Sequence, residues 1–199
     1  MLNSIKYNLA HLTDFSGRDA RQTFWFYAAF LFIVQYAIGL VVSIPMMGSM
    51  FQSAFSAVGS SEGGRIDQAE LTRTMMQQMS GYMETQMWVS VVLGALTIVL
   101  LAASFVRRLH DAGFPGWIAL VPIALHAFAL VYGVMKFDAM MAAMATQFDP
   151  ANSASPYAIQ AEIAPWSSLG WLAYVIVIGF GVLKSQSGPN RYGGEPVHH

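Results

Sequence analysis

The stretch that decides the fold is VRRLHDAGFPGW, residues 106–117, which separates two long apolar segments. It places Arg107, Arg108, His110 and Asp111 close together in a chain with only 11% charged residues. Apolar residues make up 55% of the chain, whereas a typical soluble domain has about 25% charged and about 45 to 50% apolar residues. This composition favours an integral membrane protein in which short polar segments connect apolar helices.

Four segments contain no Asp, Glu, Lys or Arg: residues 23–45, 86–106, 117–135 and 165–183. A helix needs about 20 residues to cross a hydrocarbon core about 30 Å thick, and each segment is close to or above this length. Pro122 interrupts the third segment, which membrane helices tolerate. We therefore predict an all-α membrane protein, a four-span transmembrane helical bundle. Residues 1–199 form a single integral membrane domain, with helical outer segments within 46–85 and 136–164.

The distribution of charge predicts the orientation of the bundle. An even number of spans puts both termini on one side, together with the 107–116 connection. This side carries seven of the ten cations, which are Lys6, Arg18, Arg21, Arg107, Arg108, Lys184 and Arg191. The other side carries Arg65, Arg73 and Lys136 with seven of the eleven acids. By the positive-inside rule both termini are cytoplasmic.

Three polar segments are expected to meet on this cytoplasmic face. In DFSGRDARQTFW, residues 14–25, Asp14 or Ser16 is expected to cap a helix that carries Arg18 and Arg21 on one face. The second segment is the 107–116 turn between the second and third spans. The third is SGPNRYGGEP, residues 187–196, whose glycines and prolines predict a chain of turns with a fixed shape.

These three motifs resemble the domain of unknown function 805 family of small bacterial inner-membrane proteins. The family patterns are F-x-G-R-x-x-R-x-x-[FY]-W, R-R-L-H-D-x-G-x-[ST]-G-W and G-x-N-x-[YF]-G-x-x-P. The matching residues are Phe15, Gly17, Arg18, Arg21, Phe24 and Trp25; then Arg107 to Asp111, Gly113, Gly116 and Trp117; and Gly188, Asn190, Tyr192, Gly193 and Pro196. Pro115 stands where the pattern has Ser or Thr. The resemblance implies a multi-pass protein of the bacterial inner (plasma) membrane and implies no activity.

The polar residues of these motifs have two interpretations. In the first they bind an anion, a lipid or a partner, because guanidinium groups pair bidentately with phosphate and carboxylate. The candidates are Arg18, Arg21, Arg107, Arg108, His110, Asp111, Asn190, Arg191 and Tyr192. In the second the arginines are topology signals, neutralised by Asp19 and Asp111 in a structural network. Catalysis is not favoured, because adjacent residues on a helix, such as His110 and Asp111, point about 100° apart.

Twelve of the thirteen methionines lie on the predicted outer side. Leu71, Met75, Met79 and Met83 repeat every four residues, which predicts a helical stripe. This helix either lies on the outer leaflet, with a break at Gly81, or continues into the second span. Its predicted outer contact surface is Met75, Met76, Met79 and Met83. Thioethers also bind Cu(I), but without an outer Cys or His we predict no metal site.

The sequence favours a non-enzymatic accessory or scaffold protein that contacts membrane lipid, another integral membrane protein or a second copy of itself. A net charge of -1 argues against a nucleic-acid partner, and we predict no cofactor. The alternatives are a small transporter or channel, or an enzyme acting at lipid head groups. A transporter is less favoured because the spans contain no Asp, Glu, Lys or Arg. His126, inside the third span, is expected to be a buried, hydrogen-bonded residue.

Overall fold

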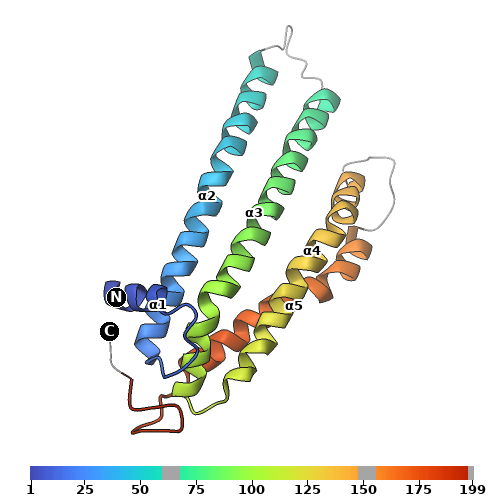
Figure 1. Ribbon diagram of the computed structural model, residues 1–199. Helices are drawn as coiled ribbons and strands as arrows, with labels where there is room; N and C mark the ends of the chain where they lie inside the picture. The colour runs from blue at the N-terminus through green and yellow to red at the C-terminus, as the bar shows by residue number, and fades with distance from the viewer. Residues whose placement is uncertain (60–67, 148–155, 197–199) are drawn as a thin grey trace.

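The computed structural model describes residues 1–59, 68–147 and 156–196, and within these ranges its regular elements are helices. They are α1 (Leu2–Ala10), α2 (Arg21–Gly59), α3 (Gln68–Asp111), the 3-10 helix η1 (Gly116–Ala119), α4 (Leu120–Gln147) and α5 (Pro156–Val182). In Figure 1 α2 and α3 run side by side as one long pair, and α4 and α5 form a second, shorter pair. Helix α1 lies across the base of α2 (Figure 1).

Three helical segments are long and apolar enough to cross a membrane: Arg21–Ser53, Arg73–Asp111 and Gly116–Met144. A shorter apolar helix covers Ser168–Val182. The predicted all-helical architecture is therefore confirmed, with three long apolar helices and one shorter one among the described residues. Helices α2 and α3 have 39 and 44 residues, which corresponds to roughly 58 and 66 Å at 1.5 Å per residue.

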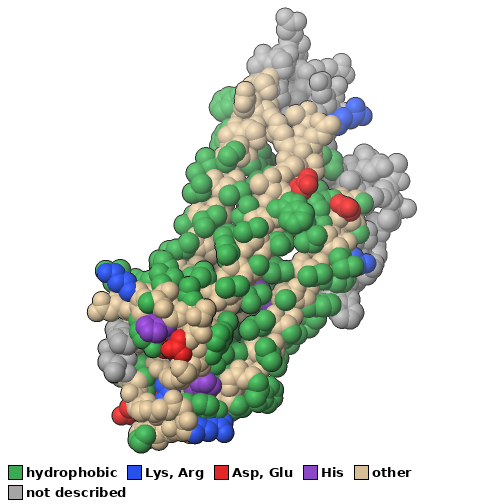
Figure 2. All heavy atoms as spheres, viewed as in Figure 1, with side chains coloured by type: hydrophobic (Ala, Val, Ile, Leu, Met, Phe, Trp, Pro, Cys, Tyr) green, Lys and Arg blue, Asp and Glu red, His purple; other side chains and the backbone are tan. Residues whose placement is uncertain are grey.

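The apolar side chains lie mainly on the outside of the bundle. Phe32, Val99, Val131 and Trp171, one from each long helix, are 68%, 64%, 59% and 74% exposed. Figure 2 shows hydrophobic side chains along the visible length of the helices and charged ones near the two ends. A continuous apolar surface of this kind is unfavourable in water and matches the interior of a bilayer. The chain therefore has the architecture of an integral membrane protein.

Buried side chains concentrate at one end of the bundle. Phe24 of α2, Phe105 and Leu109 of α3, and Ala119 of η1 form the hydrophobic core. Phe180 of α5 packs against this core. Helices α2, α3 and α5 therefore meet with η1 at the end where α3 passes into α4.

His126 lies on α4, outside this core. Its Nε2 atom is buried and has no hydrogen-bond partner in the described part of the chain, contrary to the hydrogen-bonded state expected from the sequence.

The structure gives three details of the helices that the sequence left open or predicted differently. Helix α2 continues through Pro45 to Gly59, beyond the expected first span. Helix α3 is continuous through Gly81, so the methionine stripe leads straight into the second span. Pro122 does not interrupt a helix, because it lies in the first turn of α4, where a missing N–H group is tolerated.

The methionines of the predicted outer contact surface, Met75, Met76, Met79 and Met83, are half-buried on α3. Met83 and Met87 line a cavity of about 400 Å³ between α3 and α4, and Met140 of α4 lines it from the other side. The two methionine-bearing helices therefore face each other across a cavity at the end opposite the hydrophobic core.

Candidate functional site

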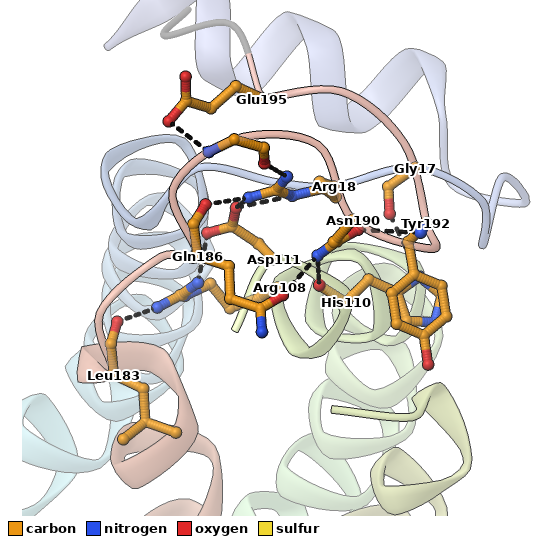
Figure 3. Close-up of polar contacts among 11 residues, drawn as sticks. Gly17, Arg18, Arg108, His110, Asp111, Leu183, Gln186, Asn190, Tyr192 and Glu195 are labelled. Atoms are coloured by element: carbon orange, nitrogen blue, oxygen red, sulfur yellow. Dashed lines mark hydrogen bonds and ion pairs between the residues drawn. The ribbon is translucent and has the colours of Figure 1, made fainter. Parts of the chain in front are cut away.

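Three arginines and two aspartates are buried at the end of α3. The exposed fraction is 7% for Arg18, 1% for Asp19 and Arg107, and 0% for Arg108 and Asp111. We call these five residues the arginine cluster. It lies where the last turn of α3 meets the segments that precede α2 and follow α5. Figure 3 shows the part of it formed by Arg18, Arg108 and Asp111.

The RRLHD motif forms the last turn of α3. The helix ends at Asp111, so residues 107–111 are helical and only 112–115 form the expected turn. Gly113 has φ +85°, a left-handed conformation that favours glycine. The N–H group of Gly113 donates to the His110 carbonyl (3.1 Å), and that of Phe114 donates to the Leu109 carbonyl (2.9 Å). These two bonds form a Schellman motif, which ends the helix.

The segment before α2 is not helical, and the predicted cap at Asp14 or Ser16 was wrong. The Asp14 Oδ1 atom instead accepts hydrogen bonds from the Ser16 N–H group (3.0 Å) and hydroxyl (2.5 Å). Such local bonds compete with helix formation, and α2 begins only at Arg21. Arg18 and Arg21 therefore do not share a helical face. Arg18 is buried, whereas Arg21 is exposed.

Arg107 binds the N-terminal segment through its whole guanidinium group. Its Nη2 donates to Asn8 Oδ1 (2.7 Å), and its Nη1 donates to the carbonyls of His11 (2.9 Å) and Asp14. The guanidinium carbon lies 5.6 Å from the centre of the Tyr7 ring. Arg107 thereby docks α1, a helix that the sequence did not predict. Its inward-facing residues include polar Ser4 and Asn8, so an apolar stripe could not have revealed it.

Asp19 neutralises Arg107, as the second interpretation of the cluster expected. Arg107 Nε donates to Asp19 Oδ1 at 3.0 Å, and the Ser104 hydroxyl donates to Asp19 Oδ2 at 2.8 Å. Burial raises the pKa of Asp19, and the ion pair and hydrogen bonds with Arg107 and Ser104 oppose this rise.

Arg108 joins α3 to the end of α5. Its Nη1 donates to Asp111 Oδ2 (2.6 Å), and its Nε and Nη2 donate to the carbonyls of Gly181 (3.2 Å) and Leu183. The last carbonyls of a helix have no partner within the helix. The Gly181 carbonyl also accepts from the Trp25 indole N–H group (3.1 Å). Arg108 and Trp25 therefore donate hydrogen bonds to carbonyl groups at the end of α5 that would otherwise have no partner.

Arg18 connects Asp111 to the C-terminal segment. Its Nε and Nη2 donate to Asp111 Oδ1 at 3.2 and 3.0 Å. Its Nη2 and Nη1 also donate to the carbonyls of Gln186 (2.6 Å) and Gly188 (2.7 Å). Asp111 thus accepts from two arginines at once (Figure 3).

His110 faces away from Asp111, as predicted, and contacts the C-terminal turn. Its ring stacks on the Tyr192 ring, with centroids 3.8 Å apart and planes inclined by 8°. The Asn190 amide donates to the His110 carbonyl (2.9 Å), and His110 Nδ1 lies 3.2 Å from the Gly17 carbonyl oxygen. Arg191 is exposed, and its guanidinium carbon lies over the Tyr192 ring, 4.6 Å from the ring centre. His110 and Asp111 therefore contact different partners and do not form a hydrogen-bonded pair with each other.

The cluster has little capacity for an external anion. The N–H groups of Arg18 and Arg107 make four hydrogen bonds each, and those of Arg108 make three, whereas a guanidinium has five N–H donors. Among the described residues no group of three or more His, Cys, Asp or Glu side chains is arranged to hold a metal ion. Of the candidate cations, Arg21 and Arg191 remain exposed.

The fold and the site define a small helical membrane protein whose two terminal segments dock on the last turn of α3. The chain belongs to the family described as "Protein of unknown function (DUF805)", whose model matches residues 12–194. The match includes the whole arginine cluster and the stack of His110 and Tyr192. Neither the curated proteins nor the solved structures gave a match.

Proposed function

We propose that this chain is a four-span protein of the bacterial inner membrane, with both termini cytoplasmic, that acts as a non-enzymatic scaffold. The observation that supports a scaffold is the internal pairing of Arg18, Arg107 and Arg108. Their hydrogen bonds hold the N-terminal segment, the end of α3 and the C-terminal segment together as one unit. This unit presents a defined surface to anionic lipid or to another membrane protein.

The exposed surface around the cluster carries more cations than acids. Its exposed cations are Lys6, Arg21, Lys184 and Arg191, and its exposed acids are Asp14 and Glu195. Within the cluster three guanidinium groups face two carboxylates, which adds a further positive charge. Anionic lipids give the cytoplasmic leaflet a negative potential that attracts such cations, by about 1 kcal/mol per residue near the surface. An acidic loop of a neighbouring membrane protein offers the same complementarity.

The orientation is tested with a reporter that is active only in the periplasm. Fused after Val197 it is expected to be silent, and inserted near Ser60 it is expected to be active. The reverse pattern would overturn the cytoplasmic placement of the arginine cluster and the four-span topology.

The contact is tested by purifying the full chain in mild detergent and identifying the lipid and protein that copurify. The double variant Arg21→Gln with Arg191→Gln should lose anionic lipid or a membrane partner while its thermal stability stays unchanged. Arg73→Gln, an exposed cation near the start of α3, is the matched control and should retain the wild-type contacts. Equal retention by the double variant and the control would contradict the proposal.

A further inference from the structure

Seven large apolar side chains form one stripe along α2. We call them the α2 stripe, and they are Ile33, Tyr36, Leu40, Ile44, Met47, Phe51 and Phe55, with exposed fractions from 51% to 74%. In a helix of 3.6 residues per turn they all fall within an arc of about 100°. Buried Leu31 and half-buried Ser53 lie on the opposite side of α2, which packs on α3. The α2 stripe therefore faces away from the bundle, and α2 runs along the edge of the bundle (Figure 1).

The far end of α2 is amphipathic in the sense opposite to that expected in water. Ser53 faces α3, where its hydroxyl oxygen accepts a hydrogen bond from Gln78 Nε2 at 2.8 Å. Met47, Phe51 and Phe55 face outward and are 59%, 63% and 74% exposed. A helix at the surface of a protein in water buries its apolar face and exposes its polar face. The outward face of α2 therefore requires an apolar partner.

Lipid covers only part of the α2 stripe. Arg21 is an exposed charged residue at the start of α2, so it lies at or outside the near surface of the hydrocarbon core. Phe51 and Phe55 follow it by 30 and 34 residues, which corresponds to roughly 45 and 51 Å along the helix axis. The hydrocarbon core is about 30 Å thick, and the bilayer with its head groups is about 40 to 45 Å thick. Both phenylalanines therefore lie beyond the hydrocarbon core, where protein must cover them.

The α2 stripe is complementary to itself in a parallel pair. Its residues recur every 11 positions, and the sets are Ile33, Ile44 and Phe55, then Tyr36 and Met47, then Leu40 and Phe51. An 11-residue repeat keeps one side of a helix against a partner with a right-handed twist. Copies in one membrane share their orientation, so a two-fold axis along the membrane normal places each residue of the stripe opposite its equivalent. No Asp, Glu, Lys or Arg lies between Arg21 and Glu62, so this pairing brings no like charges together.

We propose that two copies of this chain form a parallel dimer through the α2 stripe. The two α2 helices lie on either side of a two-fold axis along the membrane normal. The first half of the stripe packs within the bilayer, and the half from Met47 to Phe55 packs beyond it. The dimer rests on the membrane-spanning architecture. It shares no residue with the arginine surface proposed above, so either proposal can fail without the other.

The first test is disulfide crosslinking of the full chain in membranes. The chain contains no cysteine, so a single introduced thiol reports on one position. Phe51→Cys places the thiol on the α2 stripe, and Gln52→Cys is the matched control. Gln52 is exposed at the same depth, but adjacent residues on a helix point about 100° apart. Oxidation with copper phenanthroline should give at least tenfold more crosslinked dimer for Phe51→Cys than for Gln52→Cys, at equal labelling by a maleimide.

Equal crosslinking of the two variants, or none by either, would overturn the dimer and leave the stripe as a lipid-facing surface. A benzophenone maleimide attached to the Phe51→Cys thiol captures whichever protein lies against it. Capture of a second copy supports the proposal. An adduct with a different protein in place of the dimer would overturn it.

The second test measures the mass of the full chain in mild detergent by light scattering. The wild type should have the mass of two chains. Phe51→Glu places two carboxylates against each other across the two-fold axis, and it should weaken the dimer at least tenfold. Gln52→Glu adds the same charge at the same depth beside the stripe and should stay dimeric. A wild type with the mass of one chain, or equal dissociation of the two variants, would overturn the assignment of the α2 stripe.

Discussion

Replacing Asp111 by Asn tests whether the arginine cluster is a structural unit. Asp111 is fully buried, and both of its carboxylate oxygens accept hydrogen bonds from arginine. The substitution keeps the size of the side chain and removes its charge. It also places an amide NH₂ group, a donor, against the N–H groups of Arg18 or Arg108. Arg18 and Arg108 would then be buried without a carboxylate at position 111 to pair with.

The expected cost follows from burial. Removing one partner of a buried ion pair typically destabilises a protein by about 3 to 5 kcal/mol, because the remaining charge is left uncompensated. Asp111 pairs with two arginines at 3.0 and 2.6 Å, so we expect a loss of at least this size. Arg18→Gln should do part of the same damage. The double variant should be less destabilised than the sum of the single variants, by roughly 0.5 to 3 kcal/mol.

The measurement is the free energy of unfolding in detergent micelles, followed by circular dichroism during titration with denaturant. Glu84→Gln is the control, since Glu84 is exposed on α3 and a surface change of this kind should stay within about 0.5 kcal/mol. If Asp111→Asn unfolds like this control, and its effect adds strictly to that of Arg18→Gln, then the charges are independent topology signals and the reasoning fails.

Two further predictions concern the segments that the cluster holds. Arg107→Lys keeps the charge but loses the planar fork that contacts Asn8, His11 and Asp14, so it should cost about 2 kcal/mol or more. Hydrogen exchange should then become faster in α1 and stay unchanged in α4; unchanged protection of α1 would contradict this role for Arg107. Gly113→Ala forces a left-handed conformation on a residue with a Cβ and should cost roughly 1 to 2 kcal/mol. The Cβ of this alanine would lie 2.5 Å from Gln186 Nε2, so the substitution should also expose residues 184–196 to protease. A Gly113→Ala variant with the stability and the protease resistance of the wild type would refute this prediction.

Much of the architecture could be predicted because a bilayer restricts what an apolar segment can do. A segment without charges that is about 20 residues long must satisfy its own backbone hydrogen bonds, and a helix does this. The meeting of the three motifs also followed, since an even number of long helices brings both termini to the end that carries the 107–116 connection. The pairing of Asp111 with arginine could be expected for the same reason, because a buried arginine near a helix end needs a carboxylate.

The remaining details depend on tertiary contacts between residues far apart in the sequence. Arg18 and Arg21 are only three residues apart, yet one is buried and the other exposed. The difference arises because Asp14 and Gly17 turn the chain before the helix begins. Likewise α1 docks through Asn8, whose partner Arg107 is 99 residues away. No local pattern of apolar residues carries this information.

The placement of polar and apolar residues explains why the two ends of the bundle differ. Among the described residues, the buried charged side chains lie at the end that holds Arg107 and Asp111, and most of the hydrophobic core lies beside them. Helix packing in a membrane gains little from the hydrophobic effect, because lipid is as apolar as the helices. Specific hydrogen bonds must therefore fix how the helices meet, and the arginine cluster concentrates them at one end. Toward the other end α3 and α4 separate around the cavity lined by Met83, Met87 and Met140. The arginine cluster thus fixes where the end of α5 and the segment before α2 meet the last turn of α3.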